Sequence, residues 1–194
     1  SGTRQVFQTL SFRGDGATQS GAVIDLDRNY EGLGLNWNHK MRVNDLPLNW
    51  TLGIEADNLR ELRRGFVNNN GTPGALKRDE KDTARNLDFF GQLDWTFSPQ
   101  WRATTGVRSS RVRLGGDDHF GADDSGKVEF NKTSPVAGLV WSVADNINLY
   151  ANLGKGFETP TLAESAYSAG GAGPNLGLRP STSTQGEIGA KIKS

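Results

Sequence analysis

Polar and apolar residues alternate with a period of two along much of this chain. In residues 85–97 the odd positions from Leu87 to Phe97 are apolar or glycine, and the even positions are mostly polar. The same split recurs in 47–58 and in 147–154. Because successive side chains of a β-strand point to opposite sides, this alternation indicates strands with one apolar and one polar face.

The alternation predicts an all-β, antiparallel fold of about eight consecutive strands in an up-and-down meander. The strands are expected at about residues 3–13, 29–42, 47–58, 85–97, 101–114, 133–143, 147–157 and 183–193. Short turns are expected at 43–46, 98–100 and 144–146, and long connections at 14–28, 58–84, 115–132 and 158–182. Short and long connections therefore alternate, which is typical of a transmembrane β-barrel, and we expect part of such a barrel.

All five tryptophans lie near a predicted short turn and on the apolar side of their strands. They are Trp37, Trp50, Trp95, Trp101 and Trp141. Amphipathic indoles gather at membrane interfaces, so this placement predicts an aromatic belt at one rim of the barrel. The alternative is a soluble β-sandwich binding module, which also has alternating strands. A sandwich core would spread its aromatic residues along the strands, and the gathering at one end favours the membrane.

Composition narrows the function without excluding a barrel. The mean hydropathy is −0.57, but alternating strands average out as polar even when one face meets lipid. The net charge is zero, with 22 basic and 22 acidic residues, which argues against a nucleic-acid partner. There is no cysteine for a disulfide or a thiolate metal site. The first residues, SGTRQVFQ, have no apolar signal-peptide region.

The connection at 58–84 carries a dense mixture of charges and is expected to be an extracellular loop. Its candidate ligand-binding residues are Arg60, Arg63, Arg64, Lys77 and Arg78. Arginine side chains bind carboxylates and other anions through paired hydrogen bonds, so these cations could contact an anionic ligand. The alternative is a solvated charged loop that contacts lipopolysaccharide.

A second connection, GGDDHFGADD, contains the weak candidates for a metal site: Asp117, Asp118, His119, Asp123 and Asp124. Clustered carboxylates bind hard cations such as Ca²⁺, but this spacing matches no EF-hand, and a solvated acidic loop is favoured. We expect no resident metal and no cofactor. His119 with a neighbouring aspartate is also the only candidate for a small outer-membrane barrel hydrolase. Since no nucleophile stands beside it, we expect that the protein is not an enzyme.

The final third contains three successive motifs, TSPVAGLVWS, LYANLGKGFETPTLAE and PNLGLRPSTSTQGEIGAK. This succession resembles the barrel wall of TonB-dependent outer-membrane receptors. The matching positions include Gly156, Phe157, Pro160, Thr161, Leu162, Glu164, Asn175, Leu178, Pro180, Glu187 and Gly189. Ser181 departs from the pattern, because the family usually has a glutamate there.

The resemblance implies a location in the bacterial outer membrane and a parent protein that imports a ferric siderophore or a similar nutrient. Its implied partners are membrane lipid, lipopolysaccharide, a plug domain and a TonB-type energy transducer. Receptors of this family have 22 strands around a plugged lumen. We therefore expect residues 1–194 to be a single internal barrel segment without plug, TonB box or signal peptide, and not transport-competent alone. Its exposed edge strands predict self-association.

Overall fold

The computed structural model of the chain describes residues 2–8, 21–165 and 174–193, which form eight strands and one short helix. The strands are β1 (Gly2–Gln8), β2 (Val23–Val43), β3 (Leu46–Asn69), β4 (Thr72–Ser98), β5 (Trp101–Asp118), β6 (Gly126–Ala144), β7 (Ile147–Glu158) and β8 (Ser181–Ile192). The helix α1 (Leu162–Ser165) follows β7. In the described part of the chain, no helix is long and apolar enough to cross a membrane.

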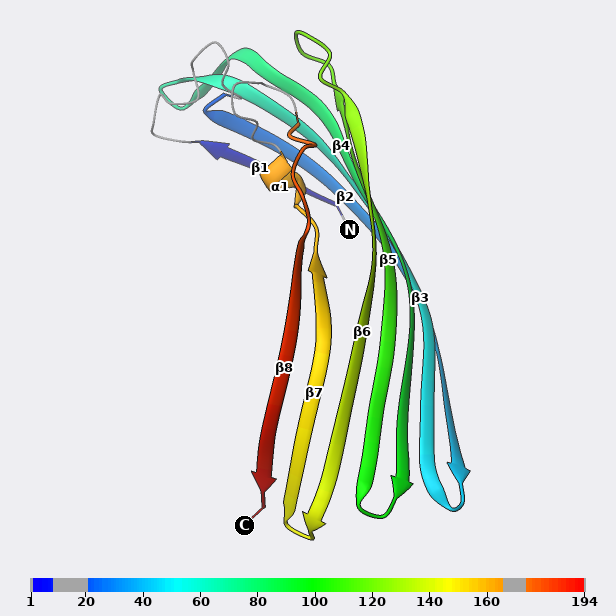
Figure 1. Cartoon of the computed structure of the whole chain (residues 1–194). Helices are drawn as coiled ribbons and strands as arrows, with labels where there is room; N and C mark the ends of the chain where they lie inside the picture. The colour runs from blue at the N-terminus through cyan, green and yellow to red at the C-terminus, as the bar shows by residue number, and fades with distance from the viewer. Residues whose placement is uncertain (1, 9–20, 166–173, 194) are drawn as a thin grey trace.

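The eight strands form one curved sheet that does not close on itself (Figure 1). Their order in the sheet is their order in the chain, from β1 to β8, and every neighbouring pair is antiparallel. The predicted meander of eight strands is therefore confirmed. A soluble sandwich needs a second sheet packed on the first. The described residues form a single sheet whose two outermost strands are not neighbours, so neither the sandwich nor a small closed barrel is present.

The strand register lines up the apolar positions of neighbouring strands on one side of the sheet. Leu35 of β2 lies opposite Ile54 of β3, which lies opposite Phe89 of β4. We call this side the apolar face. Its members include Leu33, Leu35, Trp37, Met41, Leu48, Trp50, Leu52, Ile54, Leu87, Phe89, Leu93, Trp95, Val107, Leu139, Trp141, Leu149, Leu153 and Ile188. The opposite side, with most of the polar positions, is the polar face.

Large side chains of the apolar face are exposed instead of forming a core. Leu35 is 69% exposed, Phe89 54% and Leu153 60%. The buried apolar core of the described residues is small, with Ala22, Val23, Leu26, Leu114 and Leu162. A continuous exposed apolar surface of this extent marks a contact with lipid or with another protein. On β4 it runs from Leu87 to Phe97, which agrees with the roughly 9–11 residues that a strand needs to cross a bilayer.

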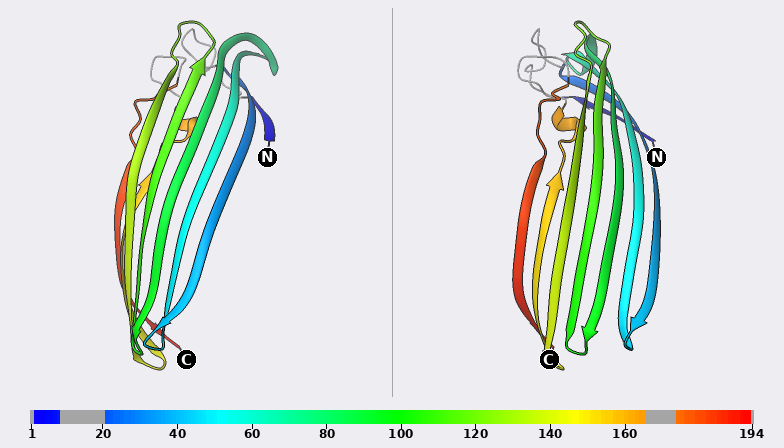
Figure 2. Two further views of the ribbon diagram at one scale, coloured as in Figure 1. Left: turned by 90° about the vertical axis from the view of Figure 1, so that its right-hand side faces the viewer. Right: turned by 45° about the vertical axis from the view of Figure 1, so that its right-hand side comes forward.

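All three predicted short turns are present, and they lie at one end of the sheet (Figure 2). The turn between β2 and β3 has two residues, Asn44 and Asp45, both with positive φ, of 50° and 62°. Positive φ at both central residues defines the type I′ turn, whose twist suits a tight antiparallel hairpin. This end of the sheet is called the short-turn end below.

The prediction of long loops is wrong for 58–84 and for parts of 14–28 and 115–132. Strand β3 continues to Asn69 and β4 begins at Thr72, so their connection is a two-residue turn of Asn70 and Gly71 with φ of 53° and 93°. Strand β2 begins at Val23, and β5 and β6 also extend into the predicted loop. In these extensions charged residues lie on both faces of the strands. The alternation of polar and apolar residues that indicates a strand is therefore absent. Residues 9–20 and 166–173, which belong to one predicted strand and two predicted loops, lie outside the described residues.

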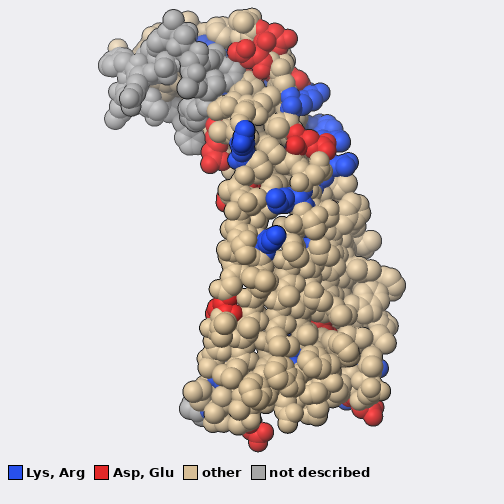
Figure 3. Space-filling model, viewed as in Figure 1, with Lys and Arg blue, Asp and Glu red and all other residues tan. Residues whose placement is uncertain are grey.

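Charged side chains gather over the upper part of the molecule in the view of Figure 3, whereas the lower part shows few. The lower part contains the short-turn end, and the upper part contains the strand extensions and α1 (Figure 1). The sheet thus has two regions, which we call the lower sheet and the upper extension. Strands β3 and β4, with 24 and 27 residues, are much longer than a bilayer crossing requires.

Candidate functional site

The five cations predicted to bind ligand lie on strands, not in a loop, and they do not form one site. Arg60, Arg63 and Arg64 are on β3, whereas Lys77 and Arg78 are on β4. Arg63 lies opposite Glu80 on the polar face, and Arg60 and Arg64 lie on the other side of the sheet. The alternation of a strand separates neighbours in the sequence onto opposite sides. Only Arg63 and Arg78 of this set are buried, 4% and 2% exposed.

A cluster of charges is buried on the polar face of the upper extension. We call it the charged cluster, and its members are Arg28, Glu61, Arg63, Arg78, Glu80 and Asp82. Glu61 accepts from Arg28 and lies 3.4 Å from Arg63 Nη1, and Arg78 Nη2 lies 2.5 Å from Glu80 Oε1. Glu61 and Glu80 are 1% and 0% exposed. Buried charges are tolerated when opposite charges pair with them. Arg28 provides such a pair from the neighbouring strand, and Arg63 and Arg78 provide it within their own strands.

Asp82 is the carboxyl group of the charged cluster without an ion pair among the described residues. Burial, with a smaller contribution from the negative charges of Glu80 and Glu61, raises its pKa to about 7. Burial also raises the pKa of Glu80, against the opposing effect of Arg78. A buried carboxylate beside other carboxylates is costly in its charged form. Asp82 therefore keeps its proton to a higher pH than an exposed aspartate does.

A capping box starts helix α1 directly after β7. The Thr161 hydroxyl accepts a hydrogen bond from the Glu164 backbone N–H at 3.2 Å, and Glu164 Oε2 accepts one from the Thr161 backbone N–H at 2.8 Å. This reciprocal pair satisfies two N–H groups that a helix start leaves without partners. The hydrogen bonds from Thr161 hold the pKa of Glu164 below its ordinary value. The motif residues Thr161 and Glu164 thus have a structural role in starting α1.

Helix α1 and the residues after 173 pack on the polar face of the upper extension. Leu162 and Ser165 are buried, and the Asn175 N–H donates to the Ser165 carbonyl at 2.5 Å. Gly116 of β5 and Gly126 of β6 lie opposite each other beneath this segment. A Cβ at Gly116 would lie 2.8 Å from Pro174 Cγ, and one at Gly126 would lie 2.5 Å from Leu176 Cδ1. The two glycines therefore allow the segment to lie close against the sheet.

The remaining motif positions line the path from β7 to β8. Gly156 lies opposite Ser183, and a Cβ there would come within 2.5 Å of the Ser183 hydroxyl. Phe157 is at the end of β7, and Pro160, Asn175, Leu178 and Pro180 lie in the connection between β7 and β8. On β8, Glu187 accepts a hydrogen bond of 2.7 Å from the Tyr150 hydroxyl, whose ring lies against Gly189. The motif therefore shapes this hairpin and its return over the sheet.

On the lower sheet the polar face carries a network of ion pairs and hydrogen bonds. Arg108 Nη2 lies 2.6 Å from Glu55 Oε2 and also donates to Asp88, so one guanidinium joins three strands. Arg102 Nη2 lies 3.1 Å from Asp94 Oδ1. Arg108 and Arg102 side chains are 43% and 60% exposed. This side of the sheet is therefore built to meet water or polar groups.

The five tryptophans lie on the apolar face near the short-turn end. Trp37 and Trp50 make an edge-to-face contact with ring centroids 4.7 Å apart, and Trp101 stacks on Trp141 at 5.3 Å. Trp95 contacts Phe97, which in turn stacks on Trp101. Trp37 is 62% exposed and Trp141 41%. The rings thus form exposed groups and are not buried in a core, and their role as a membrane-interface belt stays a prediction.

The acidic candidates for a metal site are held by local turns. Asp117 and Asp118 end β5, and His119, Asp123 and Asp124 follow in the connection to β6. Asp118 Oδ1 accepts from the Phe120 N–H and Asp123 Oδ1 accepts from the Ser125 N–H, both at 3.0 Å. Among the residues that the structure describes, no three histidine, aspartate or glutamate side chains converge as metal ligands.

Comparison with known proteins decides the family. The family model of the TonB dependent receptor-like β-barrel matches residues 2–194. The chain belongs to this family. Its members are outer-membrane β-barrel receptors and not a class of enzymes, so the chain is part of an outer-membrane β-barrel protein. The resemblance seen in the motifs is confirmed.

Solved receptors share the fold at low sequence identity. The unliganded ferric citrate transporter FecA superposes with a TM-score of 0.68 at 17% identity, over 88% of this chain and 26% of that chain. The ferric-catecholate import receptor Fiu of E. coli K12 gives 0.68 at 13%, over 98% and 34%. The alcaligin receptor FauA of Bordetella pertussis gives 0.65 at 16%, over 88% and 27%. The chain therefore spans about a third or less of each of these receptors.

Proposed function

We propose that this chain is a wall segment of an outer-membrane receptor that imports a ferric siderophore or a similar nutrient. The observation that carries the proposal is a single unclosed sheet with one exposed apolar face and one polar face, in a chain that matches the barrel family along its length. The apolar face meets hydrocarbon and the polar face lines the pore. A pore-facing network of the kind around Arg108 suits contact with water and with a plug domain.

The open edges of the sheet support the view that more strands belong to the complete barrel. Strand β1 pairs with β2 only from Val23 to Asn29, so residues 30–43 of β2 have β3 as their single strand neighbour in the described chain. Strand β8 likewise pairs on one side only, with β7. Unpaired strand edges recruit further strands, because their N–H and C=O groups need partners. Alone, the segment encloses no pore and transports nothing, and its self-association through these edges stays a prediction.

The pore side of the upper extension is where this segment would meet the ligand. Receptors that share the fold carry ferric citrate or ferric catecholate in their names, and one is named a copper transporter. An anionic iron chelate needs cations, and Arg28 is the cation of the charged cluster that is not buried, since its side chain is 34% exposed. Arg63 and Arg78 are buried and hold the carboxylates of the cluster in place.

Uptake of ⁵⁵Fe tests the proposal in cells that produce the full-length receptor containing this segment. Ferric citrate and a ferric catecholate serve as probes, each with and without a functional TonB-type transducer. We expect transducer-dependent uptake of one probe, reduced several-fold by Arg28→Gln. The matched control is Arg42→Gln, which removes a cation beside the turn at Asp45 and should leave uptake unchanged.

Equal iron uptake with and without the transducer, or uptake of neither probe under iron limitation, would contradict the import proposal. An equal loss of uptake in both arginine variants would contradict the assignment of Arg28 alone. Surface abundance of each variant, measured by antibody on intact cells, separates loss of function from loss of the protein.

A further inference from the structure

The sheet opens in its upper part, where β6 and β7 separate (Figure 1). The two strands pair from their short turn as far as Val136 of β6, which lies opposite Gly154 of β7. The next residue of β6 is Pro135, which has no N–H to donate to a neighbouring strand. Among the described residues, no strand pairs with β6 on this side from 126 to 135. We call this unpaired region the wall opening.

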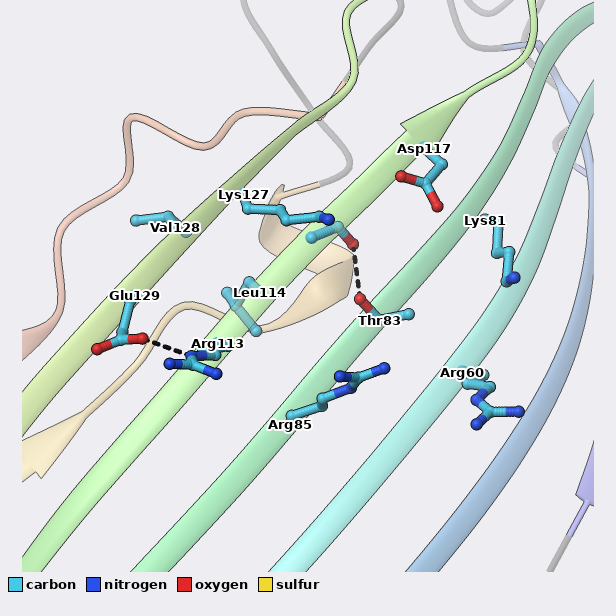
Figure 4. A pocket seen from close by; sticks show the side chains of 11 residues that line it. Arg60, Lys81, Thr83, Arg85, Arg113, Leu114, Asp117, Lys127, Val128 and Glu129 are labelled. Carbon is cyan, nitrogen blue, oxygen red and sulfur yellow. Dashed lines mark hydrogen bonds and ion pairs between the residues drawn. The ribbon is translucent and has the colours of Figure 1, made fainter.

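Each of the two strands keeps its partner on the side away from the wall opening. Strand β6 pairs with β5 up to Gly126, and β7 pairs with β8 up to Glu158. Figure 4 shows the paired side of β6 from close by, where Glu129 accepts a hydrogen bond from Arg113 of β5. The wall therefore divides into two intact pairs of strands, and the opening between them is a feature of the fold and not a frayed end.

A cavity of about 460 Å³ lies at the wall opening and is lined from both faces of the sheet. Thr133 lies opposite Ser109, which lies opposite Phe89 of the apolar face. The residue before it, Lys132, lies on the polar face. The lining residues on the side of the apolar face include Thr133, Lys155 and Thr184, and those on the polar face are Lys132, Gly156 and Ser183. The cavity therefore reaches from one side of the wall to the other.

The cavity presents positive charge and hydroxyl groups. Lys132 and Lys155 line it from opposite faces, and among the described residues neither has a carboxylate within ion-pair distance. Three threonines and two serines supply hydroxyl groups, and no aspartate or glutamate is among the described residues that line the cavity. Ammonium and hydroxyl groups donate hydrogen bonds to oxygen anions, so the cavity suits an anionic group rich in oxygen.

An apolar groove of about 690 Å³ lies on the apolar face of the three strands β6 to β8. Leu139 lies opposite Ala151, and Leu153 lies opposite Gly186, so large and small side chains alternate across neighbouring strands. Leu153 is 60% exposed. The small residues leave a hollow between the leucines that an acyl chain can fill.

The groove leads to the wall opening. Lys155 is two residues beyond Leu153 on the same side of β7, and Thr184 is two residues beyond Gly186 on the same side of β8. Two residues of a strand span about 7 Å, so an apolar site and a basic site adjoin along the same strands. In outer-membrane barrels the end remote from the short turns is extracellular. In this orientation, an amphiphile whose tail lies in the outer leaflet presents its polar group to the opening.

We propose that the wall opening is a lateral entry site for an anionic iron chelate that carries an acyl tail. The tail lies in the groove of the apolar face, and the chelate passes from Lys155 on the lipid side to Lys132 on the pore side. A chelate without a tail reaches the pore from the water above the wall and needs neither the groove nor the opening. The inference rests on the proposed import function and deepens it by naming the class of substrate.

A membrane lipid is the other amphiphile that could occupy the groove, and the two faces of the opening distinguish it from a substrate. The headgroup of a lipid stays at the membrane surface, within reach of Lys155 alone. Lys132 lies on the polar face, which lines the pore, so a lipid at the surface does not need it. A substrate on its way through the wall needs both lysines.

Uptake of ⁵⁵Fe tests this assignment in cells that produce the full-length receptor containing this segment. The probes are ferric citrate and a ferric catecholate, each in its plain form and in a tailed form whose chelator carries a dodecanoyl chain. We expect transducer-dependent uptake of a tailed probe. Lys132→Gln with Lys155→Gln should reduce that uptake by about tenfold, because two charged donors are lost, and should leave uptake of the plain probe unchanged.

A cross-link across the wall opening tests the path itself. Thr133→Cys with Thr184→Cys places two thiols at the cavity, and a bis-maleimide joins them in a receptor otherwise free of accessible cysteine. Joining them should abolish uptake of the tailed probe and leave uptake of the plain probe unchanged. The control is Ile147→Cys with Ile192→Cys, which lie directly opposite each other in paired strands at the short-turn end. Joining these two should affect neither probe.

Filling the groove tests the place of the tail. A Cβ at Gly186 would lie 3.8 Å from Leu153 Cδ1, which is an ordinary contact, so Gly186→Leu fits without strain. It should reduce uptake of the tailed probe several-fold. Ala190→Leu adds the same side chain to the apolar face of β8 outside the groove and should change neither uptake. Surface abundance and uptake of the plain probe confirm that each variant is folded.

Three results would overturn the inference: uptake of the plain probes only, an equal effect of the cross-link on both forms, or uptake of the tailed probe that persists after cross-linking. A loss of tailed uptake in Lys155→Gln but not in Lys132→Gln would indicate a surface lipid site and would also overturn it. Each of these contradicts lateral entry and leaves the proposed import standing. Uptake of no probe at all, with the transducer present, contradicts the proposed import and this inference together.

Discussion

The lower sheet and the upper extension place opposite kinds of side chain in contact with their surroundings. In the lower sheet large apolar residues such as Leu52 and Phe89 are exposed, and the polar face carries an open network of charges. In the upper extension charged residues such as Glu80 and Arg78 are buried, and Leu114 and Leu162 form a small apolar core. The difference agrees with the proposed orientation, in which one continuous set of strands meets lipid along the lower sheet and water along the upper extension.

The largest effect is expected from a charge on the apolar face of the lower sheet. Leu52→Arg should lower the free energy of unfolding of the full-length receptor in phospholipid vesicles by about 2–4 kcal/mol, because a cation there must enter hydrocarbon. The matched control is Thr51→Arg, one residue earlier on the polar face, opposite Asn38. Urea titration followed by tryptophan fluorescence measures both. Equal destabilisation by the two changes would contradict the assignment of the faces.

A smaller effect is expected from the buried carboxyl group of the upper extension. Asp82 has a folded pKa of about 7 against an ordinary value of 3.8, so the folded state binds its proton more tightly than the opened state. Its contribution to stability is fully present below about pH 4 and is lost as the pH rises towards 7. Between pH 5 and 7 the free energy of local opening should fall by about 2 kcal/mol from this group.

Hydrogen exchange of the backbone amides around residues 80–84 measures this dependence, after correction for the intrinsic effect of pH. Asp82→Asn should remove most of the slope between pH 5 and 7 and leave the exchange of the lower sheet unchanged. Asp94→Asn, on the polar face of the lower sheet, is the control. If the slope persisted in the Asp82 variant, another group would be responsible for it.

The smallest effect is expected at the start of α1. Thr161→Ala removes the hydroxyl that accepts from the Glu164 N–H and should destabilise the covering segment by about 1 kcal/mol. Thr161→Ser keeps the hydroxyl and should restore the protection. Hydrogen exchange at residues 162–165 measures the change. If exchange there were the same in all three proteins, the capping box would not stabilise this segment.

The same comparison explains what could be predicted from the sequence. In the lower sheet the strands, their order, the short turns and the apolar face were all predictable, because lipid on one side and water on the other require strict alternation, as from Leu87 to Phe97. In the upper extension water surrounds both sides, and charges such as Arg60 and Glu61 occupy successive positions on opposite faces. The two faces of the strand then do not differ in polarity, so the alternation that indicates a strand is absent from the sequence.

Two features of the candidate site also could not be deduced from residue spacing. From the sequence, charges such as Glu61 and Arg63 were expected to be solvated, and only the structure shows that they pair with each other along β3 and are buried. The turn at Asn70–Gly71 did leave a signal, because Asn-Gly is a common type I′ turn pair, and it could have indicated a hairpin in the predicted loop. The motif from Thr161 to Glu164 was found by its resemblance to the family. The structure explains why these two residue types occur there, because they form the capping box that starts α1.

Because the strands differ in length, they end at different heights at the end of the sheet remote from the short turns. Strand β4 has 27 residues and β7 has 12, and the difference lies almost entirely at the end remote from the short turns. The hairpin of β3 and β4 therefore extends further beyond the lower sheet than the hairpin of β7 and β8, and its far end, with Asn70 and Gly71 at the turn, bends over in Figure 1. In the proposed orientation, a particle too large for the pore, such as an antibody, would therefore meet a longer wall beside β3 and β4 than beside β7 and β8.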